Sequence, residues 1–102
     1  MQNIDLIKKF IKLEKYKDAE IAIKQFLLKD QNNYEYHLLL GYIYVRINKF
    51  EEAIKSYENA KNIDLNETVL NSLTNLYVRI KDYDKALIEI SESLKINSNN
   101  II

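Results

Sequence analysis

The side chains able to do acid-base or metal chemistry are few in this sequence. The 102 residues include one histidine, His37, and no cysteine. A lone histidine does not make a metal site, and a chain without cysteine has no thiolate nucleophile, disulfide or cysteine-bound zinc. We therefore expect a structural role for His37, and we expect no catalysis, no metal and no cofactor.

One pair of carboxylates has a spacing that could support acid-base chemistry. Glu89 and Glu92 lie three residues apart, which on a helix places them on one face. Such pairs are common on solvated helices, so we do not interpret them as a catalytic site. Gly41, the only glycine, belongs to no phosphate-binding motif and is better explained by close packing inside a helix.

The charge balance argues against a nucleic-acid or lipid partner. Fifteen basic and 15 acidic residues cancel, which leaves no long-range field to attract a polyanion. Tyrosines can stack on bases, but most of the eight fall in apolar columns described below, which leaves Tyr34, Tyr36 and Tyr42 as candidates. We expect no nucleic-acid binding.

No membrane contact is expected either. No apolar run approaches the roughly 18 residues that a membrane span needs. The first residues have charges among their apolar positions and lack the features of a signal peptide. The expected location is cytoplasmic.

The elements that would carry any binding site are helices. Proline is absent and glycine occurs once, so the main breakers of helix interiors are missing. Leu40, Tyr44 and Ile47 recur at steps of four and three, which marks one face of a helix. After a break at Asn48, Ala53 and Tyr57 begin a second such pattern. Together they predict a helical hairpin.

The hairpin occurs three times, with offsets of 34 and then 33 residues between successive copies. The aligned columns keep their residue class and include Leu6, Leu40 and Leu73; Phe10, Tyr44 and Tyr77; Tyr16, Phe50 and Tyr83; Ala19, Ala53 and Ala86; and Ile23, Tyr57 and Ile90. Six antiparallel helices of about 11 to 14 residues are predicted. Asn33 and Asn66 stand where N-caps of the next repeat would lie.

In these columns the sequence resembles the tetratricopeptide repeat family. The middle repeat matches best, through His37, Leu40, Gly41, Tyr44, Ala53, Tyr57 and Ala60, with Leu65 in place of the usual proline. The resemblance implies an all-α, right-handed α-solenoid of three antiparallel helix-turn-helix repeats. It would form a single domain over residues 1–102, with repeats at about 1–33, 34–66 and 67–100.

The resemblance also implies that the first helix of each repeat lines a concave groove that binds a peptide or a partner helix. Carried over position by position, the partner-binding residues are Lys8, Lys12, Leu38, Tyr42, Val45, Arg46, Asn71, Asn75 and Arg79, with Ile4, Ile11 and Val78 beside them. Lys12, Arg46 and Arg79 share a column and would form a cationic ladder, which suggests an acidic or amphipathic partner. The alternative is that these cations only solvate an exposed face.

One subtype of the family is argued against. Binders of acidic chaperone tails clamp a carboxylate with Lys, Asn and Arg, at positions that correspond here to Ile4, Lys8, Leu39, Thr68 and Ser72. Only Lys8 could make a charged contact, so no two-carboxylate clamp is expected.

The last repeat suggests a second kind of partner. Leu87, Ile90 and Leu94, with Ile96, form an apolar strip that no following helix covers. We expect self-association through this strip as a homodimer, or coverage by another repeat of a longer array, or a fold-back of the final residues Ile101 and Ile102.

Overall fold

The computed structural model describes residues 2–100 and the side chains of residues 2–97. It contains six helices: α1 (Asn3–Lys12), α2 (Tyr16–Lys29), α3 (Tyr34–Arg46), α4 (Phe50–Ile63), α5 (Glu67–Arg79) and α6 (Tyr83–Asn100). The number of helices and their order agree with the prediction. Helix α6, with 18 residues, is longer than predicted, and α1, with 10, is slightly shorter.

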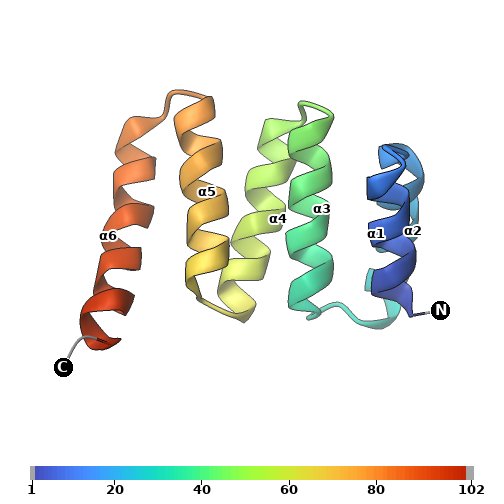
Figure 1. The fold of residues 1–102 in the computed structure, drawn as a ribbon, viewed down its shortest axis with the longest axis horizontal. Coiled ribbons are helices and arrows are strands. Elements are labelled where there is room, and N and C mark those ends of the chain that lie inside the picture. The colour runs from blue at the N-terminus through green and yellow to red at the C-terminus, as the bar shows by residue number, and fades with distance from the viewer. Residues whose placement is uncertain (1, 101–102) are drawn as a thin grey trace.

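The helices form three hairpins in series, α1/α2, α3/α4 and α5/α6 (Figure 1). The turn within each hairpin lies at one end of the molecule, and the connections between hairpins lie at the other. Each second helix packs against the first helix of the next hairpin, α2 against α3 and α4 against α5. The result is an elongated body of 41 × 30 × 22 Å in which α6 forms one end (Figure 1).

The turns within the three hairpins share one backbone conformation. The second residue after each first helix has a positive φ: 58° at Glu14, 64° at Asn48 and 65° at Lys81. The amide of the next residue then donates to a carbonyl five positions back, as Lys49 N does to Tyr44 O at 2.8 Å. This is the Schellman arrangement that ends helices. It places the two helices of each hairpin antiparallel.

The connections between hairpins end in asparagine caps, as predicted. The Asn33 side chain accepts a hydrogen bond from Tyr36 N at 3.1 Å, and that of Asn66 accepts one from Val69 N at 3.1 Å. Each satisfies an amide that has no partner inside its helix. Tyr34 strengthens the second connection because its hydroxyl donates to Asn66 Oδ1 at 3.2 Å.

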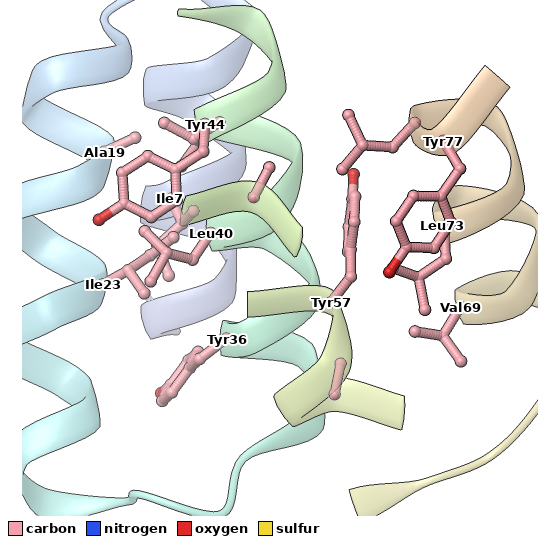
Figure 2. Close-up of a cluster of buried hydrophobic side chains, with 14 of the residues drawn as sticks. Ile7, Ala19, Ile23, Tyr36, Leu40, Tyr44, Tyr57, Val69, Leu73 and Tyr77 are labelled. Carbon is pink, nitrogen blue, oxygen red and sulfur yellow. The ribbon is translucent and has the colours of Figure 1, made fainter. Parts of the chain in front are cut away.

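The hydrophobic core extends along the series of hairpins, and at each junction between hairpins it consists of side chains from the two helices that pack there. Ala19, Ala53 and Ala86 are buried, as their column predicted. Figure 2 shows Tyr57 of α4 lying beside Tyr77 and Leu73 of α5, while the core residues of α1 and α2 lie beside those of α3. Burial of this apolar surface is the main source of stability for stacked repeats.

Two tyrosine assignments made from the sequence are wrong. Tyr36, expected to be available on the surface, is buried at the junction with α2, where its ring centroid lies 5.8 Å from that of Phe26. Tyr83, assigned to a core column, is 57% exposed. The difference follows from position in the series, because a column is buried only where a neighbouring repeat covers it.

In the part of the chain that the structure describes, no helix combines the length and apolar character needed to cross a membrane. The fold-back expected of Ile101 and Ile102 lies outside the described residues.

Candidate functional site

The groups considered for catalysis are engaged in structural contacts. His37 is half-buried, and its Nε2 lies 2.8 Å from the Gln31 carbonyl oxygen, which ties α3 to the loop before it. Among the described residues, no three His, Asp or Glu side chains gather as a metal site requires.

The expectation that Glu89 and Glu92 are solvated is wrong for Glu89, which is buried. Lys61 Nζ donates to both carboxylates at 2.9 Å, joining α4 to α6. Although burial alone would lower it, these bonds hold the pKa of Lys61 above its usual range. The pair of glutamates therefore acts as the partner of a half-buried cation.

A pocket of about 220 Å³ opens between α3 and α5. Four of the nine predicted partner-binding residues line it: Tyr42, Val45, Asn75 and Arg79. Tyr42 is 42% exposed, so an apolar surface lies beside polar side chains that can donate and accept hydrogen bonds. Of the first-helix residues predicted from the sequence, these are the ones that the structure brings together.

The pocket also contains three residues that the sequence did not predict as partner-binding: Tyr57, Leu76 and Ser72, the last of which corresponds to a clamp position of the family. Tyr57 comes from the second helix of its repeat and was assigned to a core column with Ile23 and Ile90. Burial raises the pKa of its hydroxyl to about 12, with Ser72 beside it as a hydrogen-bonding neighbour that lowers it. The one sign in the sequence was the combination of a large aromatic residue at Tyr57 with glycine at position 41 of the same repeat. The ring lies against Gly41, and it also lines the pocket beside α5.

The two arginines of the predicted ladder have partners within the molecule. Arg46 Nε donates to the Tyr16 hydroxyl at 3.2 Å, and its guanidinium carbon lies 5.9 Å from the centre of the Tyr16 ring. The guanidinium of Arg79 lies 5.4 Å from the centre of the Phe50 ring. Each arginine thus stacks on the aromatic residue that begins the second helix of the preceding repeat. This contact fixes the direction of both cations at the repeat junctions.

The other predicted groove residues lie outside the pocket. Lys8 and Lys12 are exposed on α1, Asn71 is exposed on α5, and Leu38 is half-buried against the core. Lys12 shares the column of the two arginines and has no stacking contact of that kind among the described residues.

The apolar strip predicted on the last repeat is exposed on α6. Leu87 and Leu94 are each 60% exposed, and Ile90 is 39% exposed. They lie at successive turns on one side of the helix, at the end of the series (Figure 1).

These features define a class, the α-solenoids built from stacked helical hairpins. Residues 34–67 match the family model described as tetratricopeptide repeat. That stretch is a tetratricopeptide repeat, and the resemblance seen in the sequence is confirmed. No curated protein sequence matches the chain.

Solved structures show the same fold. MamA residues 41 to the end, from Desulfovibrio magneticus RS-1, superimposes with a TM-score of 0.90 at 17% identity and covers 98% of this chain. MamA AMB-1 superimposes with a TM-score of 0.81 at 20% identity and covers 94%. The chain spans 57% and 53% of these two proteins, little more than half. The predicted fold class, a right-handed α-solenoid of three hairpins, is confirmed.

Proposed function

We propose that this chain is a non-catalytic interaction scaffold that binds an acidic or amphipathic segment of a protein partner in the groove formed by α1, α3 and α5. The observation that supports this most is the pocket between α3 and α5, where Tyr42, Asn75 and Arg79 meet. Specific protein interfaces combine an aromatic anchor, an arginine and a few polar groups in this way.

The pocket suits an acidic side chain next to an apolar one. Arg79 is held against Phe50, so less side-chain entropy is lost when it meets a carboxylate. Asn75 can donate and accept, and Ser72 lies on the same wall. Tyr42 and Val45 offer the adjoining apolar contact. Lys8, Lys12, Leu38, Arg46 and Asn71 would extend the surface along the neighbouring helices.

The proposal keeps the remaining expectations from the sequence: one interaction domain over residues 1–102, a cytoplasmic location, and no cofactor or nucleic-acid partner. The zero net charge supports the last of these.

Capture from a lysate of the source organism tests the groove. Immobilised wild type is compared with a Tyr42→Ala, Arg79→Glu variant by quantitative mass spectrometry. A Lys55→Glu variant, which adds a similar charge at an exposed position of α4 outside the pocket, is the matched control. Proteins lost only with the groove variant support the proposal, and identical captures with all three proteins contradict it.

The exposed strip of α6 supports a second candidate function, association through the end of the solenoid. Leu87, Ile90 and Leu94 would be covered by a second copy or by a further repeat. Sedimentation velocity over a concentration series tests the homodimer. A dimer that Leu87→Glu abolishes supports self-association, and a monomer at all concentrations contradicts it.

A further inference from the structure

The exposed face of α6 is equivalent to faces of α2 and α4 that are covered by the next helix of the solenoid. Tyr16, Phe50 and Tyr83 are equivalent residues that begin α2, α4 and α6. Tyr16 and Phe50 are half-buried, whereas Tyr83 is 57% exposed. The first two are covered by the next first helix, α3 or α5. The covered junctions therefore show what kind of surface fits the exposed one.

The covering helices share one face. In α3 the face consists of Tyr36, Leu40, Ile43 and Arg46, and in α5 of Val69, Leu73, Leu76 and Arg79. The three apolar positions are buried in both helices, with spacings of four and three residues. The arginine follows three residues later and stacks on the aromatic residue of the preceding repeat.

The exposed face of α6 is a stripe formed by Tyr83, Leu87, Ile90 and Leu94. On α4 the equivalent residues are Phe50, Ile54, Tyr57 and Lys61, all of which are half-buried or buried. The stripe is thus more apolar at its far end than the covered surface, where Lys61 bonds to Glu89 and Glu92. Tyr83 is the equivalent of Tyr16 and Phe50, on which Arg46 and Arg79 stack.

Within residues 2–97, whose side chains the structure describes, no segment supplies a good cover for the stripe. The two arginines of the chain, Arg46 and Arg79, are both already stacked, so an α6 stripe paired with that of a second copy would leave Tyr83 without a guanidinium. Stacking α1 of a second copy on α6 would place Lys9 at the position that Ile43 and Leu76 occupy in α3 and α5. Burying that ammonium against Leu87 and Ile90 is unfavourable.

We propose that the stripe docks an amphipathic helix of a different protein, with apolar residues at positions i, i+4 and i+7 and an arginine at i+10 that stacks on Tyr83. This inference goes beyond the second candidate function above, because it concerns the same exposed strip of α6 but names another occupant, neither a second copy nor a further repeat. The partner helix presents the face that α3 presents to α2 and α5 presents to α4. The apolar positions cover Leu87, Ile90 and Leu94, and the guanidinium fixes the register.

A titration with the full chain tests the docking. The probe is a synthetic peptide of residues 66–81, which carries the α5 face, added to isotope-labelled protein and followed by NMR. We expect shifts at residues 83, 87, 90 and 94, and about threefold weaker binding when the peptide carries Arg79→Gln. The Tyr83→Leu protein should bind both peptides equally. A peptide of residues 2–13, with the α1 face, should not shift these residues.

Short isolated helices are only marginally stable in water, so a tethered form provides a second measurement. In it, residues 64–100 are repeated after Ile96, the equivalent of Ile63, which places a second α5 face on the stripe. We expect one cooperative urea transition with a higher midpoint. Changing Arg79→Gln in the added copy should lower the folding equilibrium constant about threefold, and this effect should vanish with Tyr83→Leu.

Three results would overturn the proposal. One is separate unfolding of the added hairpin. Another is an Arg79→Gln effect that persists with Tyr83→Leu. The third is a homodimer of the unmodified chain that Leu87→Glu dissociates, because a second copy would then be the occupant. None of these readouts involves the groove, so failure here and failure of groove binding remain distinguishable.

Discussion

Gly41 and Tyr57 pack so closely that no other residue fits opposite the tyrosine without a shift. A Cβ placed at Gly41 would lie 2.5 Å from Tyr57 Cδ1 and 2.6 Å from Cε1. The equivalent pairs are Ile7 with Ile23 and Thr74 with Ile90. In the first and third repeats, where the first helix has a side chain at this position, the second helix has isoleucine, which is smaller than tyrosine. The volume between the helices is therefore filled in a different way.

Gly41→Ala should therefore destabilise the protein, although alanine is the better helix former by about 1 kcal/mol. We expect a net loss of about 1 to 3 kcal/mol in the free energy of unfolding, because the Tyr57 ring must move within a packed junction. Urea denaturation followed by circular dichroism measures it. In a Tyr57→Ile background the same change should be neutral or stabilising. An equal loss in both backgrounds would contradict the volume argument.

The positive φ at Lys81 predicts a stabilising substitution. A side chain in the left-handed region is strained, and glycine removes that strain. Lys81→Gly should raise the free energy of unfolding by about 0.5 to 1 kcal/mol. Lys85→Gly, inside α6, is the control and should lower it by about 1 kcal/mol. Thermal or urea unfolding measures both changes. Free energies of unfolding that change in the same direction for the two variants would be inconsistent with this turn geometry.

Lys61 should be more important for stability than a surface lysine. Lys61→Met leaves Glu89 buried without its cation, and breaking such a pair costs about 3 kcal/mol. The double variant Lys61→Met, Glu89→Leu should lose clearly less, because no uncompensated charge remains buried. Urea denaturation of Lys61→Met, Glu89→Leu and the double variant gives the coupling free energy between the two side chains. Additive losses would show that the pair does not interact as the distances indicate.

Glu20, at the junction between α2 and α3, should make the free energy of unfolding sensitive to acid. Burial favours the neutral form, but hydrogen bonds from Lys24 and Tyr44 outweigh it and lower the pKa below the ordinary value of 4.5. A carboxyl group whose pKa is lowered by folding stabilises the protein above its unfolded pKa. This stability is lost as pH falls from 4.5 through the folded pKa.

Urea unfolding at pH 7 and pH 3.5 checks this. Glu20→Gln should lower the free energy of unfolding at pH 7 by about 1 to 2 kcal/mol and reduce its fall with acid. Glu14→Gln, at an exposed turn position, is the control. A pH dependence that Glu20→Gln leaves unchanged would exclude this carboxylate as its source.

Much of the fold could be predicted because its signals are local. Helix periodicity, short turns and the caps at Asn33 and Asn66 are properties of neighbouring residues, and comparing the sequence with itself revealed the columns. The length of α6 was underestimated because the repeat period assigned it the length of the other helices, although no proline or glycine follows Ile96 to end the helix.

The contacts between repeats could not be predicted in the same way. The Lys61 ammonium meets Glu89 and Glu92, and Arg46 meets Tyr16, across sequence separations of 28 to 31 residues, which no local pattern specifies. The reach of Tyr57 into the pocket depends on the packing at Gly41. Equivalent columns also differ in burial, as Tyr83 shows, because burial depends on which repeat is next to them.

Peptide-display selection on the immobilised chain tests groove binding most directly. Binding of the enriched peptides is then measured with wild type, with the Tyr42→Ala, Arg79→Glu variant and with the Lys55→Glu control. We expect enriched peptides that combine an acidic residue with an apolar neighbour. Wild type and control should bind them, and the groove variant should bind them at least tenfold more weakly, roughly the loss of one interface anchor. Selection of no common pattern, or equal binding by all three proteins, would contradict it.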